Sequence, residues 1–304
     1  MQVALDELLD ELKEHVEDEL SEMPPVDDRG TSLDVEDLAV EGRTWTKLDQ
    51  VVAVVADLKG STKLGVRKHA ASTASIYEAG VHSLVQVLDD FGADDLAIQG
   101  DGAVGVFWGN KDLERAIAAG ITIKTFSERY LETEVAEKWP DAPRTGFKVG
   151  VAASPILVKR IGLRREERFE EVWAGKAVNY ATKAAQTADR GELVVSGFVW
   201  DVLEANDYIA YTCGCGGGPS ASLWEDVAIK GLPEGEPDQF GKKLTSQWCL
   251  VHGEEFCNAI LDGETRRPDV AVVRGAHSRK MAEHPVLLKA REDRKRRRAL
   301  GRLR

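Results

Sequence analysis

Two aspartates stand where their side chains could hold a metal ion. Asp57 follows an apolar, β-branched run, Val51–Ala56, and Asp101 lies between two glycines in a second apolar stretch. Carboxylates at the ends of neighbouring strands are typical ligands of Mg²⁺ beside the phosphates of a substrate. The alternative is that both aspartates only form turns, because Asp next to Gly favours a turn. Spacing alone does not decide between a metal site and two turns.

All four cysteines lie between residues 213 and 257 and could hold a zinc ion. The candidate ligands are Cys213, Cys215, Cys249, His252 and Cys257. A tetrahedral zinc site needs four of these five side chains, and it would be structural because it leaves no open position for a substrate. The alternative is four reduced thiols that only pack against their neighbours.

The residues around the two aspartates predict alternating strands and helices. Val51–Ala56 is typical of a strand buried on both faces, and a helix follows it up to a stop at Gly92. Two short strands joined by a turn at Asp101 come next. Later residues predict a helix over 113–138, a strand pair over 147–162, a helix over 178–188, and a strand followed by a helix over 192–203. This alternation predicts a layered α/β or α+β domain.

The two ends of the chain differ from this domain. Apolar side chains recur every three or four positions over residues 5–20, which predicts an amphipathic helix, and the acidic residues 24–46 predict a linker. The basic residues 289–304 are typical of a disordered tail, and less often of a contact for RNA, an anionic surface or an acidic partner segment. We therefore expect four parts, residues 1–46, 47–235, 236–288 and 289–304.

Composition and charge exclude several classes of protein. The 304 residues carry 40 basic and 52 acidic side chains, a formal charge of −12, so the surface should repel DNA and RNA. No apolar stretch is long enough to cross a bilayer, and the acidic start does not resemble a secretory signal. Four cysteines suit a reducing compartment. We expect a cytoplasmic protein with no nucleic-acid partner.

The order of the motifs resembles the catalytic domain of the class III nucleotidyl cyclases, the family of bacterial and animal adenylate and guanylate cyclases. The motifs are VVAVVADLKGSTKLG, AIQGDGAVGVFWG, FKVGVAASPILVKRIG, EEVWAGKAVNYATKAA, GELVVSG and VAIKGLPEG. Each is weak by itself, but all six occur in the order of that family. The resemblance implies an α+β, ferredoxin-like catalytic domain over residues 47–235, followed by a small Cys/His-rich C-terminal extension.

The resemblance implies that Asp57 and Asp101 bind two ions of Mg²⁺ or Mn²⁺, with the backbone carbonyl of Leu58 as a further ligand. Such ions neutralise a triphosphate and favour attack of the ribose 3′-hydroxyl on the α-phosphorus, with pyrophosphate leaving. The β- and γ-phosphates would lie on the backbone amides of Lys59, Gly60, Ser61 and Thr62.

Three more positions of the family fall on Asn179, Lys183 and Lys230. By resemblance, Asn179 orients the ribose and Lys230 binds phosphate. Lys183 replaces an arginine that stabilises the transition state; it keeps the charge but loses the bidentate geometry, so an arginine of residues 160–168 is the alternative donor. Family sites are shared between subunits, which implies a homodimer with two sites. The N-terminal helix either reinforces the dimer or docks on its own core.

The positions that read the base in purine cyclases are here Ala97 and Val172, and neither side chain can hydrogen-bond a base. In this respect the chain resembles the bacterial antiphage pyrimidine cyclases, which have a smaller base pocket and an arginine-rich turn before the asparagine helix. Trp173 adds bulk to the pocket, and the turn contains Arg160, Arg164, Arg165 and Arg168. The alternative is that these arginines form a solvated hairpin turn.

We therefore expect an enzyme that converts UTP to 3′,5′-cyclic UMP and pyrophosphate. The resemblance implies that the product is a second messenger of antiphage defence, read by a cyclic-nucleotide-responsive effector. The alternatives are a cytidylate or adenylate cyclase, or a degenerate module that binds nucleotide without turnover. Retention of Asp57, Asp101 and Asn179 favours turnover.

Overall fold

The computed structural model describes residues 3–40, 42–64, 70–163, 168–281 and 284–301. The chain divides into two compact units, of which the first takes residues 1–49 and 156–174 and the second takes residues 50–155 and 175–304. Each unit is described by itself below. Strands β2 and β5 each run from one unit into the other.

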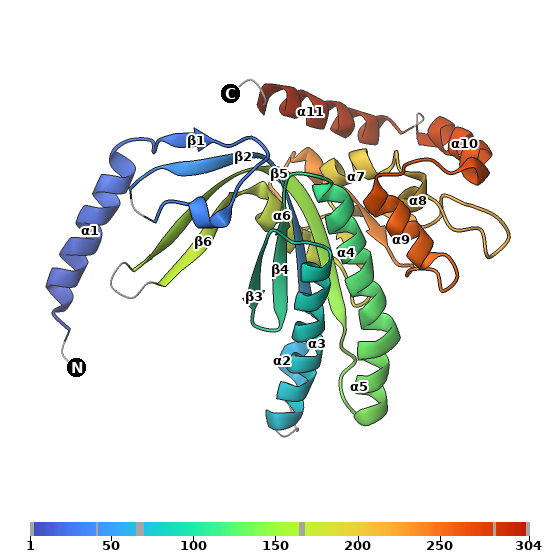
Figure 1. Cartoon of the computed structure of the whole chain (residues 1–304), viewed down its shortest axis with the longest axis horizontal. Helices are drawn as coiled ribbons and strands as arrows, with labels where there is room; N and C mark the ends of the chain where they lie inside the picture. Colours follow the sequence, from blue (N-terminus) through green and yellow to red (C-terminus); the bar gives the residue numbers. More distant parts are fainter. Residues whose placement is uncertain (1–2, 41, 65–69, 164–167, 282–283, 302–304) are drawn as a thin grey trace. The chain divides into compact units, whose positions relative to one another are not determined.

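The second unit is built on a mixed β-sheet (Figure 1). The strand order is β3-β4-β2-β5-β7-β9-β8. The bounds are β2 Trp45–Leu58, β3 Asp95–Gln99, β4 Gly102–Phe107, β5 Phe147–Leu163, β7 Leu193–Val195, β8 Trp224–Ala228 and β9 Phe240–Leu244. Strands β5 and β7 are parallel, whereas β4 is antiparallel to both β2 and β3, and β9 to both β7 and β8. The fold is therefore mixed α+β, as the motif order predicts.

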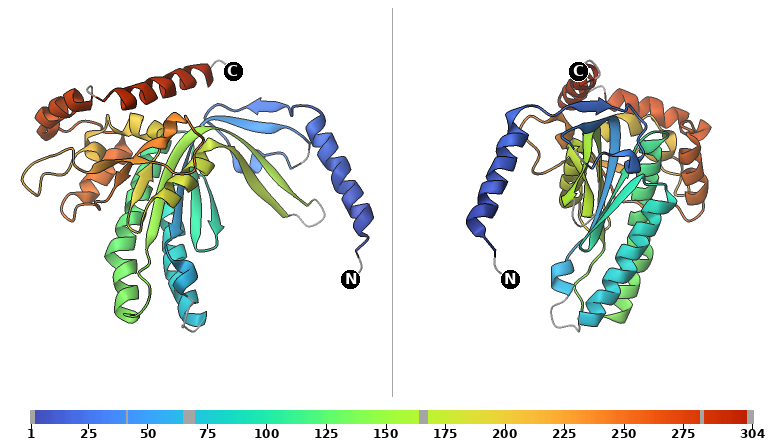
Figure 2. Two further views of the ribbon diagram at one scale, coloured as in Figure 1. Left: turned by 180° about the vertical axis from the view of Figure 1, so that it is seen from behind. Right: turned by 60° about the vertical axis from the view of Figure 1, so that its left-hand side comes forward.

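Helices cover both faces of this sheet. Leu193 and Val195 of β7 belong to the main core with α3 (Ala70–Asp90) and α4 (Asp112–Phe126). Val194, between them, packs instead with Ala184 of α6 (Lys176–Thr187). Successive side chains of a strand point to opposite faces, so α3 and α4 lie on one face and α6 on the other. Figure 2 shows α3 and α4 side by side. Residues 51–56 are buried, as expected for a central strand.

The remaining helices of this unit include the ones predicted near residues 113–138 and 197–203. Helix α4 continues through a π-turn at Ser127–Leu131 into α5, so the predicted long helix is present with one irregular turn. Gly92 has a φ of 68° just after α3, which confirms the predicted stop. The other bounds are α2 Ser61–Leu64, α5 Glu132–Lys138, α7 Gly197–Leu203, α8 Asp207–Ala210, α9 Gly253–Asp262, α10 Ala271–Met281 and α11 Pro285–Gly301.

The first unit contains α1 (Leu5–Ser21), β1 (Val26–Asp28) and β6 (Arg168–Gly175). The predicted amphipathic helix is present as α1, and none of its residues is buried. Strand β1 pairs in parallel with the first residues of β2, and β6 pairs with β5. Arg43 donates to the carbonyl oxygens of Glu19 and Glu22 at the end of α1. The segment predicted as a linker thus contains a strand and a helix-capping arginine.

Two predictions about local structure are wrong. Residues 147–162 form one strand, β5, rather than a pair. Pro155 lies where β5 leaves the second unit, and Ser154 stabilises this point by donating to the carbonyl of Pro155 and accepting from the backbone of Ala177.

The basic residues 289–301 are not a disordered tail but part of helix α11. Arg294 of α11 is buried and makes two hydrogen bonds to the carboxylate of Asp201.

In the described part of the chain, no helix is both long enough and apolar enough to cross a membrane.

Candidate active site

The pairing of β2 with β4 brings Asp57 and Asp101 to the same end of the sheet. Asp57 is the register partner of Gly102, the residue that follows Asp101. The turn at residues 100–101 that joins β3 to β4 therefore places the Asp101 backbone beside the end of β2. Asp101 is therefore adjacent in the chain to the residue that pairs with Asp57.

Gly102 is the residue that allows this close approach. A Cβ atom added there would lie 2.3 Å from the carbonyl oxygen of Ala56 and 3.1 Å from Cα of Asp57. Both obstructing atoms are backbone, so the clash could be relieved only by moving the strands apart. The glycine of this turn thus sets the spacing between the two aspartates.

We expect Gly102→Ala to lower both stability and nucleotide turnover. Overpacking at the strand pair should reduce the free energy of unfolding by about 1–3 kcal/mol, and the displaced aspartates should no longer hold a common ligand. Urea denaturation and a turnover assay measure the two effects. Gly275→Ala is the matched control, because a Cβ at Gly275 meets no atom within 4 Å. Wild-type turnover in the Gly102→Ala protein would contradict this role of the glycine.

The two carboxylates differ in their surroundings. The Oδ2 atom of Asp101 is buried, and it has no hydrogen-bond partner among the residues that the structure describes. The side chain of Asp57 is 44% exposed, and its Oδ2 is 2.6 Å from Nζ of Lys148 on β5. A buried carboxylate oxygen without a partner is costly, because the desolvation of the charge is not repaid. The arrangement fits a site for a divalent cation, which would supply the missing partner.

Lys148 was not singled out by the sequence analysis. It lies near the start of β5 among the apolar residues 147–153, is 16% exposed, and its ammonium group lies against a candidate metal ligand. A lysine within this apolar stretch is the signal that could have indicated it.

Residues 58–62 follow Asp57 directly. Leu58 is buried, and Gly60 has a φ of 79°, which bends the chain into the short helix α2. The backbone of Lys59 is fixed on both sides, because its N–H donates to Gly146 and its carbonyl accepts from the hydroxyl of Thr145. The Lys59 side chain pairs with Asp189. The structure thus places residues 59–62, predicted to bind phosphates, beside the aspartate pair.

Helix α6 carries Asn179 and Lys183 one turn apart. Asn179 is exposed and donates to the carbonyl of Gly175, while Lys183 donates to Gln186. The aliphatic part of Lys183 lies against Gly231, where an added Cβ would be 3.3 Å from its Cδ. The backbone N–H of Lys230 donates to Thr187 at the end of α6. The structure therefore brings Lys183 next to the turn that contains Lys230.

A cavity of about 150 Å³ lies between strands β2, β3 and β4 and helix α6. Asp57, Gln99 and Gly102 line it from the strands, and Thr182 and Gln186 line it from α6. The two α6 residues are not among the predicted site residues. Their spacing of four positions is the signal that places them on one helix face.

The positions predicted to read the base lie in different units. Ala97 is an exposed residue of β3 in the second unit, opposite Val104 of β4. Val172, which is 39% exposed, and the half-buried Trp173 lie on β6 in the first unit. Arg160 pairs with Glu171 there. Of the other arginines in the predicted turn, Arg164 and Arg165 lie outside the described residues.

Four of the five predicted zinc ligands lie close together, and the fifth is not part of their group. Cys213, Cys215, Cys249 and His252 form a group that could hold a metal ion. Cys257, on α9, is not part of this group. Burial raises the pKa of the Cys257 thiol, as expected for a neutral thiol packed among other side chains.

Comparisons with known proteins were made by sequence and by structure. The chain is 51% identical over 296 residues to a uridylate cyclase from Micromonospora echinofusca, and the match covers 97% of each protein. The chain belongs to the uridylate cyclase family. A uridylate cyclase from Propioniciclava tarda is 46% identical over 297 residues and 96% of each chain, and one from Burkholderia cepacia is 27% identical over 60% of this chain and 79% of its own. No family model matches the chain.

Solved structures agree with this membership at the level of the fold. The adenylyl cyclase CyaB from P. aeruginosa matches with a TM-score of 0.53 and 15% identity, over 65% of this chain and 94% of its own. The guanylate cyclase domain of RhGC from Catenaria anguillulae, solved in complex with GTP, matches with a TM-score of 0.50 and 12% identity, over 66% of this chain and 98% of its own. This uridylate cyclase family member is thus a nucleotidyl cyclase with the cyclase fold.

Proposed function

We propose that the protein converts UTP to 3′,5′-cyclic UMP and pyrophosphate with the help of two metal ions. One structural observation carries the proposal. The pairing of Asp57 with Gly102 brings residues 57 and 101 to one end of the sheet, and Oδ2 of Asp101 is buried without a hydrogen-bond partner among the described residues. The uridylate cyclase relatives, which match along nearly the whole chain, support the choice of UTP.

Asp57, Asp101 and the backbone carbonyl of Leu58 would hold Mg²⁺ or Mn²⁺. When bound, the ions would neutralise the triphosphate and lower the pKa of the ribose 3′-hydroxyl. Lys148 would hold the Asp57 carboxylate in place at the strand end, because its ammonium group is 2.6 Å from that carboxylate. No protein general base is needed in this scheme.

The remaining residues would position the substrate. The backbone amides of residues 59–62 would bind the β- and γ-phosphates, and Asn179, which is exposed on α6, would orient the ribose. Lys183 and Lys230, whose segments meet at Gly231, would offset the negative charge that develops on the phosphates. A positive charge that is already in place beside the reacting groups stabilises the transition state without any rearrangement of the protein.

A homodimer with shared sites would bring one subunit's aspartates to the other subunit's Asn179 and Lys183. Among the described residues, the Asn179 side chain hydrogen-bonds to Gly175 through its amide nitrogen, which leaves its amide oxygen available to a ligand from outside the helix. We further propose that the enzyme acts in the cytoplasm and that its product is a second messenger in antiphage defence.

Base selectivity tests the proposal most directly. We expect the purified full chain with Mn²⁺ to cyclise UTP at least about a hundredfold faster than ATP or GTP, because neither Ala97 nor Val172 offers a hydrogen bond to a purine. Each nucleotide is supplied at equal concentration, and the cyclic product and pyrophosphate are quantified by chromatography and mass spectrometry.

The Asp101→Asn protein, prepared in parallel, controls for a contaminating cyclase. Faster formation of cyclic CMP would make the protein a cytidylate cyclase. Cyclic AMP formed faster than cyclic UMP would overturn the pyrimidine assignment. The absence of any cyclic product from properly folded dimer would favour a module that binds nucleotide without turnover.

A further inference from the structure

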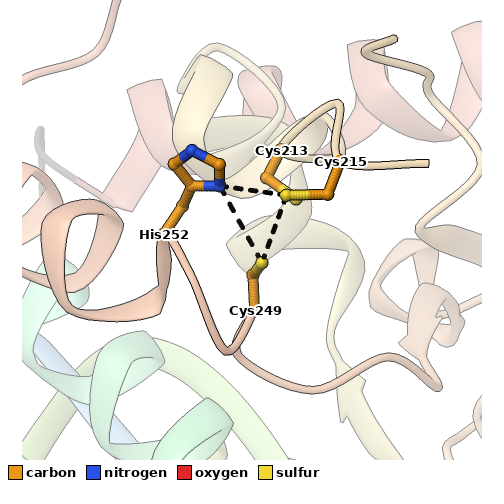
Figure 3. A group of neighbouring side chains, drawn as sticks. All are labelled: Cys213, Cys215, Cys249 and His252. Atoms are coloured by element: carbon orange, nitrogen blue, oxygen red, sulfur yellow. Dashed lines mark hydrogen bonds between the residues drawn. The ribbon is translucent and has the colours of Figure 1, made fainter. Parts of the chain in front are cut away.

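Four side chains from two distant segments converge at a place that the proposed reaction does not use. The sulfur atoms of Cys213, Cys215 and Cys249 and a ring nitrogen of His252 all lie within 4.8 Å of one another, and Figure 3 shows the four side chains pointing toward one centre. The first two cysteines lie in the loop between α8 and β8, and the other two residues lie in the turn before α9.

The distances within this group match the edges of a tetrahedron around zinc. Sγ of Cys215 is 3.8 Å from Sγ of Cys249, and these two sulfur atoms are 3.2 and 3.9 Å from Nδ1 of His252. A zinc–sulfur bond of about 2.3 Å places the corners of a regular tetrahedron about 3.8 Å apart. A disulfide would instead hold two sulfurs about 2.05 Å apart, and all four cysteines are free thiols.

The loop that contains Cys213 and Cys215 is rich in glycine. Gly214, between the two cysteines, has a φ of 85°, and Gly217 and Gly218 have φ values of 120° and 118°. This conformation lets both thiols turn to the same side of the loop (Figure 3). Glycines lose much conformational entropy on folding, so such a loop gains stability from a crosslink between its thiols and a rigid neighbour.

The opposite segment is held firmly on the core. The indole N–H of Trp248 donates to Thr122 of α4, and the Trp248 backbone N–H donates to Thr125. Cys249 follows Trp248 directly, and its sulfur accepts a hydrogen bond from the backbone N–H of Val251. These contacts hold the Cys249 thiol in place against the core.

We propose that Cys213, Cys215, Cys249 and His252 bind a structural zinc ion, with three thiolates and Nδ1 of the histidine as ligands. Three sulfurs and one nitrogen in tetrahedral geometry are a donor set that zinc prefers. All four positions are filled by protein, so the ion has no open site for a substrate. It would join the glycine-rich loop before β8 to the start of α9.

Metal content tests the proposal. The full chain, expressed with zinc supplied and purified under reducing conditions, should contain about one zinc per subunit by elemental mass spectrometry. Cys215→Ser and Cys249→Ser should each lose most of that zinc, whereas Cys257→Ser should keep it. Cys257→Ser is the matched control, because it removes a thiol from the adjacent helix without touching the group. Removal of zinc by a chelator should lower Tm by about 5 °C or more.

Cobalt provides a readout that does not depend on how the variants fold. Wild-type protein loaded with Co²⁺ should show the visible absorption bands of a tetrahedral thiolate complex, and these should also appear in Cys257→Ser. Zinc-free wild-type protein that also fails to develop the cobalt bands would overturn the proposal. Loss of zinc from Cys257→Ser, or a disulfide between Cys215 and Cys249 in freshly purified protein, would overturn it as well.

Discussion

Asp101→Asn should reduce the formation of cyclic UMP by about a thousandfold or more, because it removes the charge of one metal ligand while keeping the shape of the side chain. The same change should leave the metal-free protein as stable as the wild type or more stable. The reason is that Oδ2 of Asp101 is a buried oxygen with no partner among the described residues, and an amide is less costly to bury than a charge. Steady-state turnover and thermal denaturation without metal measure the two effects.

Asp90→Asn is the matched control, since Asp90 lies exposed at the end of α3. It should change neither quantity. If the Asp101→Asn protein retained more than about a tenth of wild-type turnover, Asp101 would not be a metal ligand required for the reaction. A large loss of stability would instead show that the carboxylate supports the fold.

Mixing two inactive proteins should restore activity if each site takes residues from two subunits. Asp57→Ala lacks a metal ligand and Asn179→Ala lacks the ribose ligand, so each homodimer has two damaged sites. A heterodimer would combine both defects in one site and leave the other intact. At equal amounts half of the dimers are mixed, so the mixture should reach about a quarter of wild-type activity.

The mixture is incubated until native mass spectrometry shows that the subunits have exchanged, and turnover is then compared with that of each parent. Asp57→Ala mixed with Asp101→Ala serves as the control, because both changes damage the same half of the site and no intact site can form. Activity at the parental level after verified exchange would contradict a shared site.

The residues that could be predicted from the sequence are those that local chemistry determines. The apolar run before Asp57 predicts a buried strand, and Gly92 predicts the end of a helix, because burial on two faces and a positive φ each leave a local signature. The two strands joined by a turn at Asp101 could also be predicted, since two apolar runs flank a turn dipeptide. The order of the six motifs predicted the fold of the domain that contains them.

Contacts between distant residues could not be predicted in this way. The arginine-rich end was expected to be disordered because blocks of like charge repel, yet Arg294 is held by a carboxylate 93 positions earlier. The pairing of Lys148 with Asp57 likewise depends on how β5 lies beside β2. The sequence alone also did not show which of the five zinc candidates lie together, and Cys257 on α9 is not part of the group of four.

Helix α11 is also connected to the helix that carries Asn179. Burial tends to raise the pKa of Glu236, but hydrogen bonds from Lys176 and Tyr180 of α6 hold it below its usual value. Arg297 of α11 donates to the same carboxylate. Helices α11 and α6 therefore share one buried carboxylate.

A fragment limited to the motif-bearing region should be much less stable than the full chain. A fragment that stops at residue 235 would discard Glu236, the acceptor for Lys176 and Tyr180, and would remove Arg294, the partner of Asp201. The loss of one partner from a buried ion pair is strongly destabilising. The part of the chain that performs the chemistry is therefore smaller than the part that must be made for it to fold, and affinity tags or reporter fusions are better attached ahead of α1 than after α11.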